Sequence, residues 1–243
     1  MRNARRDFLV AVGAALAFPK LSYGQGTQVS SLIDHIILGC NDLAKGVDFV
    51  STRTGVQAVF GGVHPGGGTR NALIRLGERR YLEILAPDPD QPSVADSLNL
   101  RALPAPRLIG WAVHTDNIEE TERRLRAGGL EVLDAKAGSR RRPDGRLLSW
   151  RIMYLKDNMN GLLPLFFVEW DAASPHPSVD APRGCDLTTF EIWAPNRVDI
   201  TRRLDILGLN TPVIAASPPH LRVAISGPKG KLELSSLDAA SPS

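Results

Sequence analysis

The stretch IDHIILGCNDLAKGVDFVSTRTGV, residues 33–56, predicts the first elements of the fold. It opens with a short apolar run typical of a buried strand, and Asn41-Asp42 follows as a helix cap. Leu43, Val47 and Val50 then recur at helical spacing, and Gly55 ends the pattern. Three β-like runs come next, at residues 57–63, 71–76 and 80–86. The predicted order is therefore β-α-β-β-β.

The same pattern returns twice along the chain. The second copy begins with LIGWAVHTDNIEETERRLRAGGLEV, residues 108–132, and the third with CDLTTFEIWAPNRVDITRRLDILGL, residues 185–209. The copies start about 75 residues apart, and the proline-rich residues 87–106 and 171–184 join them. In the second copy we expect strands at residues 131–135, 147–153 and 165–170.

A single βαβββ unit cannot bury both faces of its own sheet. Two units side by side form a curved sheet with helices outside and a concave cleft inside, where a small molecule can bind. We therefore expect an α+β fold with units at residues 31–90, 107–172 and 185–238, which together make one domain.

The first 24 residues have the parts of an export signal. Arg2, Arg5 and Arg6 form a basic start, residues 8–18 are apolar, and small residues precede a cleavage point before Gln25. The paired arginines resemble a bacterial twin-arginine signal, which predicts a periplasmic or secreted protein. A buried N-terminal helix is the structural alternative.

The net charge of +3 belongs to this segment. Removing it takes away four basic residues and one acidic residue, which leaves 25 basic and 25 acidic residues. A chain with this balance gives no electrostatic reason to expect nucleic-acid binding. No apolar run approaches the roughly 18–20 residues that span a bilayer, so we expect no stable membrane span. Cys40 and Cys185 match no metal or redox spacing. The sequence allows either a disulfide between them or two separate buried thiols.

Several stretches carry a family resemblance. Residues 33–56, the run GTRNALIRLGERRYLEILAPD at 68–88 and the run LPLFFVEWDAASPHP at 163–177 resemble glyoxalase-like domain proteins. That branch belongs to the vicinal oxygen chelate superfamily, which includes glyoxalase I, extradiol dioxygenases and bleomycin-resistance proteins. The resemblance covers roughly residues 32–236 and implies paired βαβββ units around a cleft.

The resemblance also implies a divalent metal held in the cleft. His35 and Glu83 stand at the superfamily's ligand positions in the first unit, and Glu169 aligns with Glu83 in the second. Imidazole and carboxylate suit zinc, nickel, manganese or iron. Gly110, however, aligns with His35, so the standard four-ligand set lacks one member. The alternatives are a core histidine bonded to Asp34 and a Glu83 that pairs with an arginine such as Arg70 or Arg75.

The glycine-rich run GGVHPGGGTRNA, residues 61–72, lacks the spacing of a phosphate loop and leads into a strand. We expect it to form a lip of the cleft, where side chains of the run grip a polar small molecule. These candidate binding residues are His64, Thr69, Arg70 and Asn71. His176 is expected to fold back over the cleft, whereas the cluster at residues 140–142 is expected to be a basic turn tip.

Two functions follow from these features. The first is a metal-dependent lyase, isomerase or dioxygenase that acts on a small oxygen-rich molecule, with Glu169 or Glu83 as a proton shuttle. The second is a metal-free protein that binds or sequesters a small molecule, which the glycine at position 110 favours. The sequence leaves open whether the protein forms a homodimer.

Overall fold

The computed structural model describes residues 29–91, 98–142 and 144–237. The predicted export signal lies outside these residues and stays a prediction. The three repeated stretches each have the expected order of one strand, one helix and three strands. The elements are β1 (Ile33–Gly39), α1 (Leu43–Thr54), β2 (Val59–His64), β3 (Thr69–Arg75), β4 (Tyr81–Pro87), β5 (Arg107–His114), α2 (Ile118–Ala127), β6 (Lys136–Arg141), β7 (Leu147–Tyr154), β8 (Phe166–Trp170), β9 (Asp186–Ala194), α3 (Arg197–Leu207), β10 (Val213–Ala215), β11 (His220–Gly227) and β12 (Gly230–Ser235).

Each helix begins at a polar cap, which the sequence predicts for α1. The side chain of Asp42 accepts a hydrogen bond of 2.9 Å from the backbone N–H of Lys45 at the start of α1. Asn117 caps α2 in the same way, and Asn196 caps α3. Gly55 ends α1 with a φ of 81°, a left-handed conformation that glycine adopts without strain.

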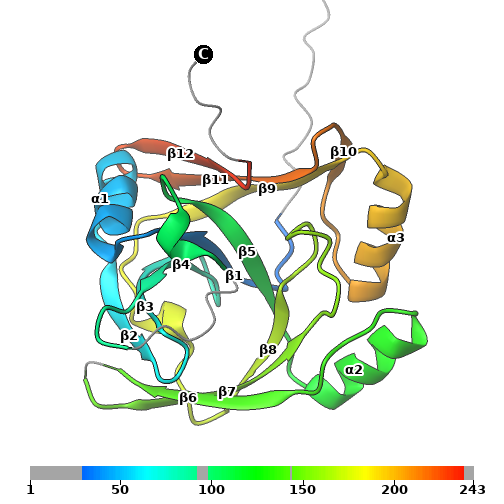
Figure 1. Cartoon of the computed structure of the whole chain (residues 1–243), viewed down its shortest axis with the longest axis horizontal. Coiled ribbons are helices and arrows are strands. Elements are labelled where there is room, and N and C mark those ends of the chain that lie inside the picture. Colours follow the sequence, from blue (N-terminus) through cyan, green and yellow to red (C-terminus); the bar gives the residue numbers. More distant parts are fainter. Residues whose placement is uncertain (1–28, 92–97, 143, 238–243) are drawn as a thin grey trace, which may run out of the picture.

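The first two units share one curved sheet. Its eight strands run in the order β2-β3-β4-β1-β5-β8-β7-β6, so β1 and β5 are neighbours at its centre (Figure 1). The sheet curls until its edge strands β2 and β6 approach each other, and the Arg140 guanidinium on β6 donates to the Gly61 carbonyl on β2. The result is a nearly closed barrel with a hollow concave face, as the α+β expectation requires.

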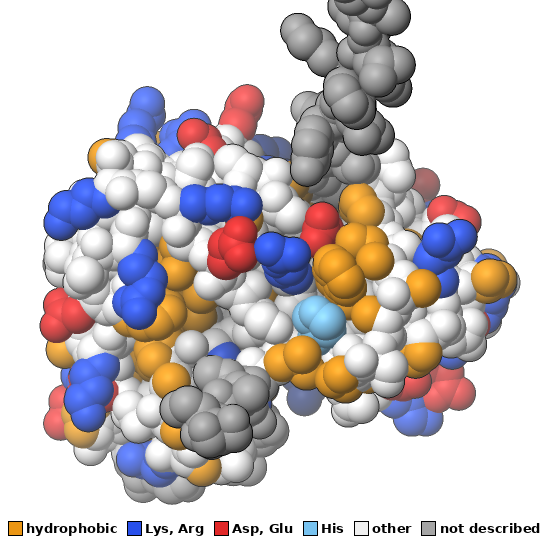
Figure 2. Space-filling view, turned by 90° about the horizontal axis from the view of Figure 1, so that it is seen from above, with side chains coloured by type: hydrophobic (Ala, Val, Ile, Leu, Met, Phe, Trp, Pro, Cys, Tyr) orange, Lys and Arg blue, Asp and Glu red, His pale blue; other side chains and the backbone are white. Residues whose placement is uncertain are grey.

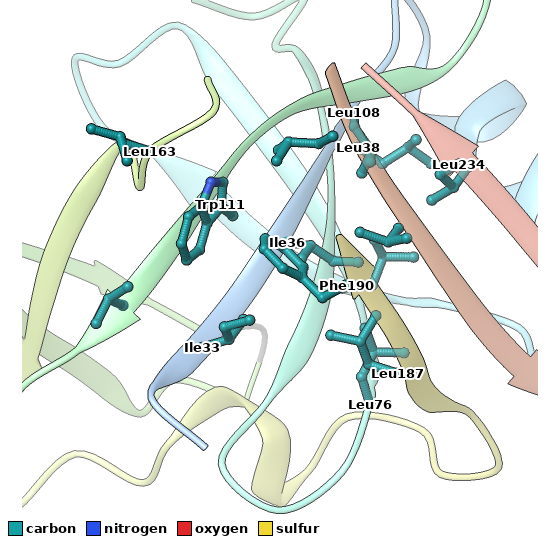
Figure 3. Packing of buried hydrophobic residues seen from close by; sticks show 14 of the residues in the cluster. Ile33, Ile36, Leu38, Leu76, Leu108, Trp111, Leu163, Leu187, Phe190 and Leu234 are labelled. Atoms are coloured by element: carbon teal, nitrogen blue, oxygen red, sulfur yellow. The ribbon is translucent and has the colours of Figure 1, made fainter. Parts of the chain in front are cut away.

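The third unit covers the convex side of this barrel. Its strands form a separate sheet in the order β10-β9-β11-β12, which lies across the top of the barrel in Figure 1. The hydrophobic core fills the space between the two sheets, where Trp111 of β5 packs on Phe190 of β9 with 4.8 Å between the ring centroids (Figure 3). The central strand β1 is buried on both faces, because one face meets this core and the other faces the barrel interior.

One predicted strand is in the wrong place. Residues 131–135 contribute only an isolated bridge between Val132 and Leu155, and the strand follows them as β6. Its sequence KAGSRR is polar because β6 is an edge strand, and such strands carry polar and charged residues. Hydrophobic alternation therefore could not reveal it, and Arg140 lies on this strand rather than at the tip of a turn.

The outer surface mixes charges of both signs. Seen from above, Lys and Arg side chains lie close to Asp and Glu side chains and to hydrophobic ones (Figure 2). On the third unit, for example, Glu233 pairs with Arg222 and with Lys231, at 3.0 Å each. In the described parts of the chain, no helix has the length and apolarity needed to cross a membrane.

Candidate functional site

The concave face of the eight-stranded sheet encloses a cavity of about 550 Å³. Its wall has two chemically different sides. Strands β1, β3 and β4 contribute polar groups, among them His35, Asn71 and Glu83. Strands β7 and β8 contribute aromatic rings, namely Trp150, Tyr154, Phe166 and Trp170. A ligand that fills the cavity would therefore meet reactive groups at one side and an apolar surface at the other.

Asp34 organises the polar side from behind. It is fully buried and accepts hydrogen bonds from His35 Nδ1 at 2.7 Å, His176 Nε2 at 3.1 Å and Trp170 Nε1 at 3.0 Å. Burial raises the pKa of the Asp34 carboxyl, but the hydrogen bonds from His176 and His35 outweigh burial, and the pKa lies below its ordinary value. Asp34 is thus a carboxylate that holds two histidines in place.

This contact fixes the orientation of His35. Because a carboxylate can only accept, Nδ1 of His35 carries a proton, so that Nε2 is an acceptor in the neutral form of the ring. The ring stacks on Tyr81 with 4.5 Å between centroids, and Phe166 contacts it from another direction at 5.5 Å. His35 is therefore 3% exposed, yet its Nε2 edge belongs to the cavity wall.

Glu83 faces this edge from β4. Its Oε2 atom lies 3.7 Å from His35 Nε2, and its Oε1 atom accepts a hydrogen bond of 2.6 Å from Asn71 Nδ2. His64 Nε2 lies 3.7 Å from Oε1, and its Nδ1 contacts Thr69 Oγ1 at 2.8 Å. Burial lowers the pKa of His64, so this ring is neutral at physiological pH.

The glycine-rich run thus supplies three of its four candidates to the cavity wall. His64, Thr69 and Asn71 line the cavity, whereas Arg70 lies between Thr69 and Asn71 on the opposite face of β3. His176 reaches the site indirectly, because it does not line the cavity and its Nε2 atom instead contacts Asp34 behind the wall. The side chain that donates a hydrogen bond to Glu83 is that of Asn71 and not that of an arginine.

The structure places Glu169 away from the other two candidate ligands. On β8, Phe166, Val168 and Trp170 line the cavity, so Glu169 points to the opposite face. There Arg151 Nη1 pairs with it at 3.2 Å. Glu83 stands opposite Ile37 in the pairing of β4 with β1, and Phe166 stands opposite Ala112 in the equivalent pairing of β8 with β5. Phe166 is therefore the counterpart of Glu83 in the second unit.

The donor set does not fit the metal that the resemblance implies. The second unit offers Gly110 and Phe166 at the two ligand positions, and neither has a donor atom in its side chain. In the first unit, the amide of Asn71 already occupies one oxygen of Glu83. Within the described residues, no group of three or more His, Cys, Asp or Glu side chains could hold a metal ion.

Sequence reasoning found one supporting residue of this site and missed two. The contact of His35 with Asp34, the alternative that the sequence left open for a core histidine, is present in the structure. Trp170 gave no signal, because its bond to Asp34 joins residues 136 positions apart. Arg140 was hidden in a basic cluster, although it is 5% exposed and lines the cavity.

One solved structure supports the fold, and others resemble part of the chain. A hypothetical protein from Staphylococcus aureus matches with a TM-score of 0.58 and 16% identity, over 84% of each chain. Methylmalonyl-CoA epimerase from Mycobacterium tuberculosis matches at a TM-score of 0.42 and 20% identity, over 60% of this chain and 93% of that one. The Streptomyces coelicolor epimerase in complex with 2-nitronate-propionyl-CoA gives 0.43 and 23%, over 60% and 100%.

No curated protein matches the chain. A family model does, and its description is a glyoxalase-like domain that spans residues 33–208. The match begins at β1, ends just after α3 and includes every residue of the cavity wall discussed above. The chain therefore belongs to the glyoxalase-like domain family.

Proposed function

We propose that this protein is an enzyme that transfers a proton on a small organic molecule, with His35 and Glu83 as its acid–base pair. The observation that carries the proposal is the distance of 3.7 Å between His35 Nε2 and Glu83 Oε2 at the wall of the cavity. This chemistry is of the isomerase or lyase type, and it uses residues that the chain itself supplies.

The two groups are suited to opposite steps. Because the N–H at Nδ1 of His35 donates to Asp34, Nε2 of the neutral ring is free to accept. This atom can therefore take a proton from an acidic carbon. The electron pair of that C–H bond moves to a neighbouring carbonyl oxygen, which gives an enolate. The proton then passes from His35 Nε2 to the facing Glu83 Oε2, and Glu83 returns it to the same or a neighbouring carbon, so both groups are restored and no oxidant or reductant is needed.

The surroundings protect this exchange from solvent. Glu83 is 7% exposed, and Tyr81 and Phe166 enclose the His35 ring. A low local polarity strengthens the electrostatic effect of each group on a bound molecule. The aromatic rings of β7 and β8 would hold the apolar body of that molecule next to the acid–base pair.

Deuterium exchange tests the proposal without knowledge of the natural substrate. Phenylacetone and phenylpyruvate share the same acidic CH₂ group next to a ketone and a ring that fits an aromatic wall. In deuterium oxide, ¹H NMR should show loss of that CH₂ signal faster with wild-type protein than in buffer. His35→Asn should slow the catalysed exchange at least about 100-fold, the usual contribution of one general base.

The matched control is Glu233→Gln. Glu233 is an exposed carboxylate on β12, in the separate sheet, so its loss should leave the exchange rate unchanged. Exchange at the buffer rate for both probes, or a His35→Asn protein as fast as wild type, would contradict the proposal. Retained binding of the probes without exchange would instead favour a small-molecule binding protein.

A further inference from the structure

Arg140 is a buried cation in the wall of the cavity. It lies on the edge strand β6, its residue is 5% exposed, and it lines the same cavity as Glu83 and His64. The next residue, Arg141, is exposed on the opposite face of the strand and donates to the Gly145 carbonyl. Only one of these two neighbouring arginines therefore faces the interior of the barrel.

A glycine on β2 makes room for this side chain. A Cβ atom at Gly62 would lie 2.7 Å from Arg140 Nη1, closer than side chains pack, and Gly62 has a φ of 138°. The Gly61 carbonyl next to it accepts a hydrogen bond from Nη1. The pair Gly61-Gly62 thus admits and anchors the guanidinium at the seam between β2 and β6.

Arg140 forms no ion pair with an Asp or Glu side chain in the described parts of the chain. Its hydrogen bond goes to a neutral carbonyl, that of Gly61. Burial lowers the pKa of Arg140, and the attraction of Glu83, whose oxygens contact Asn71, His35 and His64, only partly offsets this effect. A buried charge without a directly paired counter-charge is costly, and a guanidinium retains further N–H donors that can bind one.

We propose that Arg140 binds a carboxylate of the substrate, so that the protein acts on a small carboxylic acid with an apolar body. The carboxylate would supply a directly paired counter-charge, and a guanidinium binds carboxylates with paired, charge-assisted hydrogen bonds. The apolar body would lie against Trp150, on the strand that pairs with β6, and against Trp170 of β8. Arg101 also lines the cavity, but it is exposed, so water screens its charge.

The inference rests on the proposed function for one detail, namely that the acidic carbon of the bound molecule faces His35 and Glu83. With the carboxylate at Arg140 and the apolar body at the tryptophans, the carbons between these two groups would face His35 and Glu83. Recognition itself needs no turnover, so binding tests the two ideas separately.

Isothermal titration calorimetry with 3-phenylpropionate and 3-phenylpropanamide provides the test, because the two probes differ in charge but hardly in shape. Wild-type protein should bind the acid roughly tenfold or more tightly than the amide, as one charge-assisted pair predicts. Arg140→Gln should remove this preference and leave the affinity for the amide within about twofold of wild type. Arg140→Lys should keep a reduced preference for the acid, because lysine retains the charge but cannot form the two parallel hydrogen bonds of a guanidinium.

Arg141→Gln is the matched control, with the same loss of charge one residue away on the outer face, and it should bind like wild type. His35→Asn should also keep the preference, so that a failure of proton transfer does not count against recognition. Equal affinities in wild type, binding of neither probe, or a preference that survives in Arg140→Gln would overturn the inference. If circular dichroism shows that Arg140→Gln does not fold, Arg140→Lys decides, and a preference equal to that of wild type overturns it.

Discussion

His35 and Glu83 face each other diagonally across two paired strands, with 3.7 Å between Nε2 and Oε2. The direct partner of His35 in the β1–β4 pairing is Tyr81, whereas Glu83 stands opposite Ile37. Because alternate residues of a strand share a face, this register turns both side chains toward the cavity and stacks Tyr81 beneath the imidazole. The predictions below test what this arrangement does.

The first prediction concerns Asp34. In Asp34→Asn, the amide cannot accept from His35, His176 and Trp170 as the carboxylate does, so a buried donor loses its partner. We expect the free energy of unfolding to fall by about 2 kcal/mol at pH 6. Urea unfolding measures this loss, and Asp134→Asn, which removes an exposed carboxylate, should leave stability unchanged.

The effect of Asp34 also depends on pH. The folded protein lowers the pKa of this carboxyl, so its contribution to stability is complete above the ordinary value of 3.8 and is lost as the pH falls below it. The difference in stability between wild type and Asp34→Asn should therefore be smaller at pH 3 than at pH 6. A difference that grows toward acid pH would contradict this assignment.

The second prediction compares two glutamates. Glu83→Gln should slow deuterium exchange of phenylpyruvate at least about 100-fold, because the amide cannot carry the returning proton. Glu169→Gln should leave the rate at the wild-type level, because Glu169 points away from the cavity and pairs with Arg151. The reverse order of effects would show that Glu169, as the sequence alignment suggests, is the reactive residue.

The third prediction concerns the effect of added metal ions on thermal stability. Because the second unit places Gly110 and Phe166 at the ligand positions, zinc, nickel, manganese or iron should not raise the melting temperature. An ion that binds the native state must stabilise it, so thermal unfolding with each metal and with EDTA is a direct measurement. Stabilisation that disappears in His35→Asn would contradict the account and support a metal centre at His35 and Glu83.

The fourth prediction concerns the cysteines. Both are free thiols in buried positions, and burial raises the pKa of Cys40 to about 11. The native protein should therefore react slowly with iodoacetamide at pH 8, whereas both thiols should react at once in urea. Mass spectrometry counts the labelled sites, and an unlabelled pair in urea that reacts only after reduction would show a disulfide.

Much of the fold could be predicted from local sequence signals. Asp42 and Gly55 bound the first helix where the sequence places them, because caps and turns act within a few residues. The strand β6 could not be predicted, since an edge strand is held by backbone hydrogen bonds and needs no apolar face. The packing of the third unit over the convex face also depends on contacts between distant residues, such as Trp111 with Phe190.

The site was predicted in part for the same reason. His35, Glu83, Asn71 and His64 belong to local motifs, and the structure brings them to one cavity. Glu169 lies one residue out of phase with Phe166 and Val168, and a shift of one residue reverses the face of a strand. The role of Arg140 depends on the closure of the barrel between β2 and β6, which no local pattern reports.

The most direct test of the central claim is a double-mutant cycle on deuterium exchange of phenylpyruvate in the presence of EDTA. Two groups that act as one acid–base unit are not additive, because either loss already disables the unit. We predict that His35→Asn and Glu83→Gln each slow the exchange at least about 100-fold. The double variant should be no more than about twofold slower than the slower single variant. Additive losses, or single variants that exchange deuterium at the wild-type rate, would contradict the claim that His35 and Glu83 transfer the proton together.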